Sequence, residues 1–244
     1  MGNELTGKTF AAVFAAFLLS AAVAAAYQAW LPDVSVLRMD NPRTTKYVEL
    51  YVRRVLSKGG HPAVSMVWVP LEGISPYLRY AVLIAEDDRF YSHRGVDWEA
   101  LRQAAGYNLK RRRLSRGAST ITQQVARNLF LSPSRTPMRK LRELLIARHI
   151  DRSLDKDRIL EIYLNIVEWG VGIFGAEAAS LAYFEKHAAD LSPEEAVALV
   201  AALPSPYRLN PTQPDPVTLQ KIDVYLQRMR RAGRLPPPAE PEQP

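Results

Sequence analysis

The sequence predicts a mainly α-helical protein in which one apolar helix precedes a single domain. Apolar residues recur at helical spacing through most of the chain after residue 76. Clear helix-start signals occur as well, such as the capping box Ser192-Pro193-Glu194-Glu195. Strand-like composition is confined to a short segment, 61–70. The 244 residues therefore provide one good-sized domain or two small lobes.

The apolar segment near the N-terminus predicts a membrane anchor over residues 10–31. Phe10 to Trp30 contains no charged residue, and 21 helical residues span about 31 Å, close to the hydrocarbon thickness of a bilayer. The alternative is a cleaved signal peptide ending near Ala24-Ala25-Ala26, but the apolar run exceeds the usual length of such peptides. Lys8, in the short segment 1–9, favours a cytoplasmic N-terminus with the remaining chain outside.

The composition excludes some kinds of site but does not identify the substrate. The chain has no cysteine, which excludes disulfides and thiolate metal sites. Its net charge of +7 favours anionic partners, which include lipid head groups, pyrophosphates and nucleic acid.

After the anchor we expect a linker over residues 32–60, a domain over 61–232 and a disordered Pro-rich tail over 233–244. The linker carries a helical pattern at 47–56, and segment 61–70 is a short strand or extended stretch. Pro133 and Pro137 interrupt the chain, and Gly170, Gly172 and Gly175 predict a loop. Within the domain, helices are predicted over 76–86, 97–109, 120–130, 138–154, 155–165, 176–184, from 193 onward, and 216–230.

An acidic run follows the helix predicted over 76–86. The apolar face of that helix places Glu86 at or near its end, where a partly buried carboxylate suits a general base. From the residues alone, two other interpretations stay open. Residues 86–88 could form a solvated acidic helix end, or Asp88 and His93 could hold a metal ion.

Glu143 has a second unusual setting, because it shares a helix face with apolar residues. Those residues are Ile146, Ala147 and Ile150. A carboxylate on such a face requires a partner, and Arg139 and Lys140 are at hand. The spacing is compatible with a functional carboxylate in a cleft and with a structural ion pair.

A polar run over 117–124 lies between these acids, with Arg116 and Arg127 on its flanks. Hydroxyls, amides and Arg forks all match phosphate and sugar oxygens, although a Ser/Thr-capped helix start is the simpler interpretation. The basic run 110–113 lacks the aromatic residues of a nucleic-acid site, and we expect it to meet lipid phosphate.

Taken together, five segments in order resemble the signatures of the peptidoglycan glycosyltransferases. The first three are AEDDRFYSHRGVDWEAL, RGASTITQQVARNLFL and RKLRELLIA, which match E-D-x-x-F-x-x-H-x-G, G-x-S-T-x-T-Q-Q and R-K-x-x-E-x-x-x-A. The fourth and fifth are RILEIYLNIVEWGVGIFGAEAASLAYF and ALVAALPSPYRLNP. With no penicillin-binding transpeptidase domain following, the chain looks like the monofunctional, membrane-anchored biosynthetic type.

The resemblance implies a lysozyme-like fold with a large lobe and a small, mobile, membrane-facing jaw. It also implies a reaction: polymerisation of lipid II into β-1,4-linked glycan strands, with inversion at the anomeric carbon and release of undecaprenyl diphosphate. The implied location is the bacterial cytoplasmic (inner) membrane, crossed once, with the catalytic domain on the periplasmic side. Inhibition by moenomycin is implied too.

Residue by residue, the resemblance makes Glu86 the base that deprotonates the acceptor 4-hydroxyl and Glu143 an organiser of the donor pyrophosphate site. Arg127 and Arg135 match basic positions that contact the pyrophosphate, and Arg127 replaces the more familiar Lys. The other matched substrate-binding positions are His93, Ser119, Thr120, Gln123, Gln124, Arg139, Lys140 and Asn165.

No cofactor is expected to be required, although Mg²⁺ or Mn²⁺ at the donor pyrophosphate is compatible with the resemblance. The expected partners are lipid II, the growing lipid-linked glycan chain, the membrane, and other cell-wall synthesis or division proteins, but no nucleic acid. Two alternatives differ in function: a lysozyme-like enzyme that cleaves glycan, which needs an acid but no pyrophosphate cradle, and a catalytically inactive membrane scaffold of a cell-wall complex.

Overall fold

The computed structural model describes residues 13–18, 20, 30–111, 117–134 and 136–235. The chain divides into two compact units, residues 1–33 and 34–244. In the first unit, residues 13–18 are helical and exposed. No helix within the described ranges combines the length and the apolar composition needed to span a bilayer. Most of the predicted anchor, together with segment 1–9 and most of the Pro-rich tail, lies outside those ranges.

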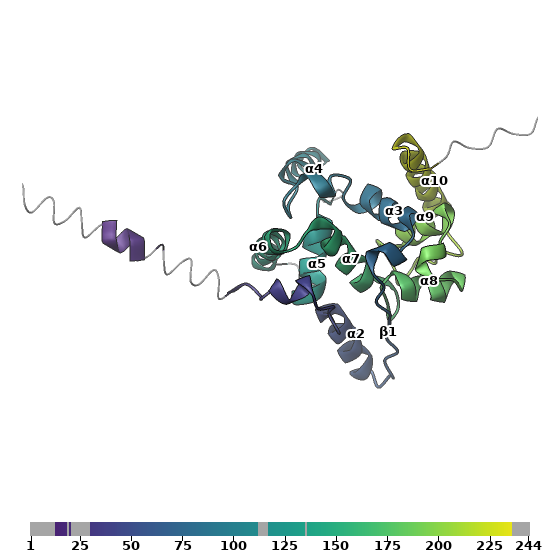
Figure 1. Ribbon diagram of the computed structural model, residues 1–244, viewed down its shortest axis with the longest axis horizontal. Coiled ribbons are helices and arrows are strands. Elements are labelled where there is room, and N and C mark those ends of the chain that lie inside the picture. The colour runs from purple at the N-terminus through teal and green to yellow at the C-terminus, as the bar shows by residue number, and fades with distance from the viewer. Residues whose placement is uncertain (1–12, 19, 21–29, 112–116, 135, 236–244) are drawn as a thin grey trace, which may run out of the picture. The chain divides into compact units, whose positions relative to one another are not determined.

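The second unit is mainly α-helical, which confirms that part of the predicted fold class (Figure 1). Its helices are α2 (Lys46–Leu56), α3 (Pro76–Glu86), α4 (Trp98–Arg111), α5 (Ile121–Phe130), α6 (Pro137–Ser153), α7 (Lys156–Ile166), α8 (Ala176–Phe184), α9 (Pro193–Ala202) and α10 (Pro216–Arg231). The helix break predicted at Pro133 and Pro137 lies between α5 and α6, and Pro137 itself opens α6, where its missing N–H costs no hydrogen bond. The capping box of α9 forms as expected, with Ser192 and Glu195 exchanging hydrogen bonds.

A small three-stranded sheet replaces the loop predicted around the glycines. Its strands are β1 (Ser65–Met66), β2 (Glu168–Gly170) and β3 (Ile173–Phe174), in the order β1-β3-β2. β3 pairs in parallel with β1 and antiparallel with β2. The loop prediction was wrong because strands of two or three residues carry no measurable alternation, and their pairing depends on a segment about a hundred residues away.

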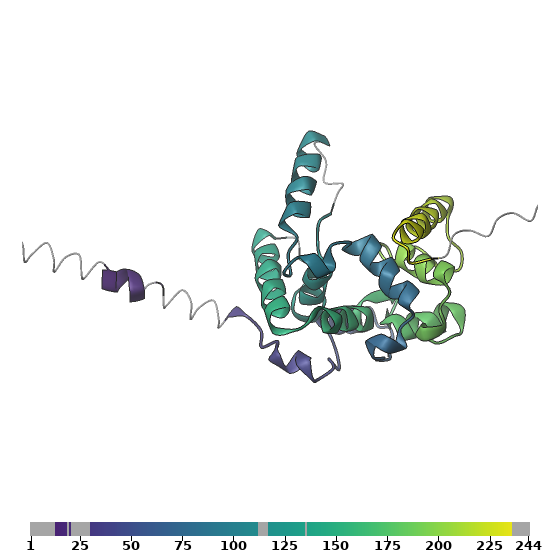
Figure 2. The ribbon, with the colours of Figure 1, turned by 45° about the horizontal axis from the view of Figure 1, so that its top comes forward.

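Two groups of helices build the core. α3 packs against α9 and α10, and α5 packs against α6 and α7 (Figure 1). α9 is buried from Ala196 to Ala202, which is typical of a helix at the centre of a domain. α4 extends away from the other helices (Figure 2). The C-terminal end of α3 meets α5 where the two groups join, and the candidate site lies there.

Arg158 of α7 fastens the start of the second unit to the domain. Its acceptors in this segment are the carbonyl oxygens of Leu37 (2.8 Å) and Asp40 (3.0 Å) and Oδ1 of Asn41 (2.8 Å), and it also pairs with Glu161 of α7. The guanidinium also lies over the ring of Trp68, 5.3 Å from its centroid. Val34 is fully buried in the same segment. Residues 34–41 are therefore an integral part of the fold.

Candidate active site

Glu86 stands at the centre of the candidate site. It is the last residue of α3 and half-buried. Its Oε2 accepts a hydrogen bond of 2.7 Å from Nε2 of Gln124 on α5. Both side chains line a cavity of about 640 Å³. The carboxylate predicted at a helix end thus faces a volume that accommodates sugar units.

One face of α5 lines this cavity. Gln124, Arg127 and Asn128 lie three and four residues apart, so they share that face. Arg127 brings a guanidinium into the cavity, and within the described part of the chain its buried Nε has no hydrogen-bond partner. A carboxylate from the end of α3 and a cation from α5 therefore line the same cavity.

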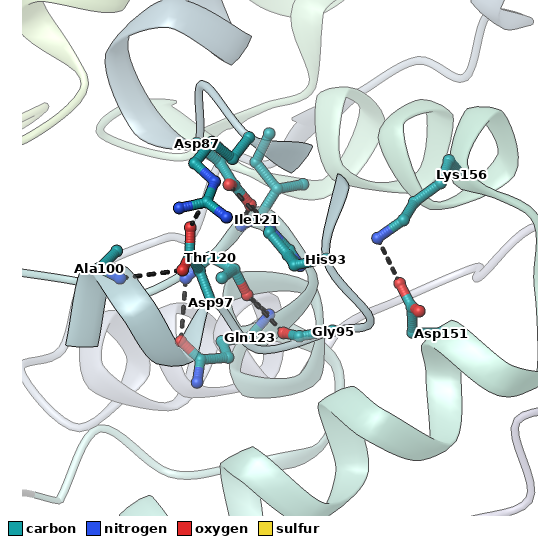
Figure 3. Close-up of polar contacts among 11 residues, drawn as sticks. Asp87, His93, Gly95, Asp97, Ala100, Thr120, Ile121, Gln123, Asp151 and Lys156 are labelled. Carbon is teal, nitrogen blue, oxygen red and sulfur yellow. Dashed lines mark hydrogen bonds and ion pairs between the residues drawn. The ribbon is translucent and has the colours of Figure 1, made fainter. Parts of the chain in front are cut away.

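Asp87 connects the end of α3 to the start of α5. Its carboxylate lies 2.9 and 3.0 Å from Nε2 of His93, and it accepts the Ile121 N–H at 3.0 Å (Figure 3). Both side chains of the Asp87–His93 pair are buried. His93 is consequently a partner of Asp87 in this structure. Asp88, its companion in the metal interpretation, instead points to Arg228 at 3.3 Å.

Thr120 and Gln123 also hold segments of the protein together. They form the capping box of α5, and the Thr120 hydroxyl donates to the Gly95 carbonyl at 2.6 Å (Figure 3). Gly95 has φ +78°, and a Cβ there would lie 2.6 Å from the carbonyl oxygen of Ala147 on α6. The three segments that resemble the first three signatures are thus in direct contact, and Thr120 and Gln123 are nearly inaccessible.

Glu143 is fully buried on the apolar face of α6, as its spacing predicts. One carboxylate oxygen accepts from Arg139 at 2.5 Å and the other from Lys140. Lys140 Nζ also donates to the Ser119 hydroxyl at 3.0 Å, and Ser119 lines the cavity. The buried acid therefore fixes two cations, one of which reaches the cavity wall.

A second pocket of about 280 Å³ adjoins the first. Both pockets are lined by Ala85, Glu86, Gly117 and Ser119. The second pocket is also lined by Asp88 and by Arg228 of α10. Glu86 is therefore accessible from two compartments, one of which contains Arg127.

One predicted site residue lies away from both pockets, and another is not among the described residues. Asn165 is fully buried. Its Oδ1 accepts a hydrogen bond from the Val69 N–H, and its Nδ2 donates to the carbonyl oxygens of Val69 and Glu161, each at 2.9 Å. It faces the interior and lines neither pocket. Arg135 is outside the described residues, as is Arg116.

Sequence reasoning missed a polar wall of the larger cavity. Glu168 at the start of β2 accepts a hydrogen bond of 2.6 Å from the Tyr207 hydroxyl. That hydroxyl in turn accepts one of 2.7 Å from Arg54. Burial raises the pKa of Glu168, opposed by the hydrogen bond from Tyr207 and the charge of Arg54. An acid directly after a buried helix was the one available signal, because Tyr207 lies far along the chain.

It also missed Tyr163, which is fully buried behind Gln124. Its hydroxyl donates to Gln124 Oε1 at 3.4 Å. Burial raises its pKa well above the usual value, and the charge of Glu86 adds to that shift. A hydroxyl among the mostly apolar buried residues of α7 was the signal for it.

This arrangement suits transfer of a group from an anionic leaving group. Glu86 can take a proton from a hydroxyl nucleophile, and Arg127 can stabilise negative charge that develops nearby. Neither group needs to form a covalent intermediate.

Comparison with known proteins agrees with this chemistry. A family described as Transglycosylase matches residues 54–230. The chain is 40% identical over 218 residues to a biosynthetic peptidoglycan transglycosylase of Nitrosospira multiformis, covering 89% of this chain and 95% of that protein. Proteins of the same description from Chromobacterium violaceum (40% identical, 93% of this chain, 97% of that one) and Rhodospirillum centenum (47% identical, 71% and 76%) are similar too.

Proposed function

Because this chain belongs to the transglycosylase family, we propose that it is a peptidoglycan glycosyltransferase that polymerises lipid II into β-1,4-linked glycan strands. The observation that carries the proposal is the position of Glu86. It lies on the shared wall of two pockets, and the larger one also holds the Arg127 guanidinium. Two sugar substrates could meet at one base in this way.

In the proposed reaction, the 4-hydroxyl oxygen of the acceptor attacks the anomeric carbon of the donor as its proton passes to Glu86. The bond from that carbon to the diphosphate oxygen breaks, and undecaprenyl diphosphate leaves with the bonding electron pair. One displacement converts the α-linked donor into a β-1,4 linkage, so the configuration inverts.

Charge on the departing diphosphate requires nearby donors. Arg127 is placed to supply a fork of N–H groups, and Lys140 and Ser119 offer further donors at the cavity wall. Glu143 would act indirectly, because its carboxylate holds Arg139 and Lys140 in place. We assign Asp87, His93, Thr120, Gln123 and Asn165 to positioning, since their side chains bond protein groups.

A divalent cation at the pyrophosphate would take most of its ligands from substrate oxygens and water. No three His, Asp or Glu side chains among the described residues gather into a metal-binding group, and both oxygens of Glu143 accept from cations.

We further propose a lysozyme-like two-lobe domain held at the cytoplasmic membrane of a bacterium by residues 10–31, with its catalytic side facing the periplasm. The uncharged composition of Phe10 to Trp30 supports the anchor. A lipid-linked substrate gives such an anchor its purpose.

The decisive test is incubation of the purified protein, in detergent, with lipid II. Wild type should produce lengthening glycan chains, and Glu86→Gln should lose nearly all turnover. Shortening of preformed glycan would instead support a cleaving enzyme, and full turnover by Glu86→Gln would exclude Glu86 as the base. Moenomycin should bind wild type and block turnover.

A further inference from the structure

We infer that Tyr163 is a positioning residue for the general base and acts on Glu86 through the side-chain amide of Gln124. The inference rests on the proposed role of Glu86. It assigns a task to a buried titratable group that the reaction itself does not use. Three helices contribute one residue each: α3, α5 and α7.

The contacts form a short chain that leads from the interior to the cavity. Tyr163 is fully buried, and its hydroxyl donates to Oε1 of Gln124 at 3.4 Å. Gln124 Nε2 then donates to Oε2 of Glu86 at 2.7 Å. Gln124 is itself 8% exposed, so few water molecules reach its amide. The Glu86 carboxylate is the member of this chain that meets both pockets.

The amide has two ends that are nearly equal in size but opposite in hydrogen-bonding character. With the NH₂ group toward Glu86, it donates to the carboxylate. Rotated by half a turn, it would present an oxygen to another oxygen and repel it. The acceptor-only carboxylate of Glu86 itself favours the first arrangement, and the Tyr163 hydroxyl that donates to Oε1 holds the amide in that arrangement from behind.

Tyr163 is suited to this task because it remains a phenol. Burial and the nearby charge of Glu86 both raise its pKa, so it keeps its proton across the working range of the enzyme. The contact of 3.4 Å is longer than the usual O–H···O separation of about 2.8 Å. Its effect is therefore chiefly on the orientation of the amide.

Other charges around this chain would be unchanged by a Tyr163→Phe substitution. The charges of Asp87, just after α3, and of Arg127 on α5 act on Tyr163. On α10, burial raises the pKa of Tyr225. The charge of Glu86 adds to that rise, and the charge of Arg228 opposes it. If Tyr163→Phe shifts the pH dependence of turnover, the cause is therefore the loss of the hydrogen bonds that connect Tyr163 to Glu86 through Gln124.

The test is the pH dependence of lipid II turnover by full-length Tyr163→Phe in detergent. We expect kcat to fall about three- to tenfold with KM unchanged. We expect the acidic limb of the profile to move about half a pH unit upward, because an ionised carboxylate loses a well-oriented donor. The matched control is Tyr183→Phe, which removes a phenol hydroxyl bonded at 3.3 Å to the Trp169 carbonyl. Its profile should superimpose on wild type.

Gln124→Met provides a second, independent variant that removes the amide while keeping its length. It should reproduce the shift of the acidic limb, and adding Tyr163→Phe to it should change nothing further. An unshifted limb in either single variant, or an additive effect in the double variant, would overturn the inference. If Glu86→Gln retained full turnover, the proposed function itself would fail, which is a distinct result.

Discussion

Lys140 and Ser119 are bonded across the wall of the larger cavity, with Nζ of the lysine 3.0 Å from the serine hydroxyl. The other partner of Lys140 is the fully buried Glu143. A carboxylate in the core of α6 and a hydroxyl at the cavity surface are therefore connected by one flexible ammonium group. Substitutions at the two ends should have different consequences.

Glu143→Ala should lower stability more than any change at the cavity surface. It leaves Arg139 and Lys140 facing a buried void, and breaking such a buried pair costs about 3 kcal/mol. Ser119→Ala should lower turnover while shifting unfolding by less than about 0.5 kcal/mol. Urea unfolding and lipid II turnover measure the two effects. Equal stability losses in both variants would contradict this division.

Arg127 is expected to matter for turnover and little for folding. Arg127→Ala should reduce kcat about 100-fold, because the cation that meets the leaving group is lost. Arg127→Lys keeps the charge but not the fork, and should stay within about tenfold of wild type. Arg102→Ala, an exposed position on α4, is the matched control. An active Arg127→Ala would show that leaving-group charge is stabilised elsewhere.

Glu168 should make stability depend on pH in an unusual direction. Burial raises its pKa in the folded state, so its favourable contribution is complete below its ordinary pKa and is lost as pH rises through the folded value. Glu168→Gln should therefore raise the thermal midpoint relative to wild type by about 1–3 °C more at pH 8 than at pH 4.

The control for that measurement is Glu72→Gln, an exposed acid in the turn before α3. Its difference from wild type should be the same at both pH values. A Glu168→Gln advantage that is larger at pH 4 would reverse the sign of the linkage and refute the explanation.

Gly95 should tolerate no side chain. Its φ is +78°, and an added methyl carbon would lie 2.6 Å from the carbonyl oxygen of Ala147, which together predict a loss of about 3 kcal/mol for Gly95→Ala. Gly106→Ala is the opposite case, since it lies within α4 with no atom within 4 Å of a Cβ. It should raise stability by up to about 1 kcal/mol. Thermal unfolding of both variants tests the pair.

Local signals predicted those elements that are determined by local physics. The Ser192 capping box and the spacing around Glu143 each indicated a helix and its buried face, because caps and periodicity act within one or two turns. Glu86 at the end of α3 followed from the same reasoning.

What the sequence could not supply was the pairing of distant segments. Tyr207 contacts Glu168, and Tyr163 contacts Gln124, each across 39 residues. Thr120 and Gln123 match substrate-binding positions, and tertiary packing buries both in the cap of α5, where Thr120 also lines the smaller pocket. A polar residue offers the same donors in either setting, so only the fold distinguishes them.

The hydrogen bonds from Arg158 to residues 37–41 determine where the protein can be truncated. A fragment that starts near residue 33 keeps every acceptor of that guanidinium and leaves Val34 covered. One that starts at α2 would leave the arginine with Glu161 and Trp68 alone and would remove the buried Val34. A truncated protein for crystallisation without detergent should therefore begin before residue 34. Residues 34–41 have the composition of a linker, but they are part of the fold.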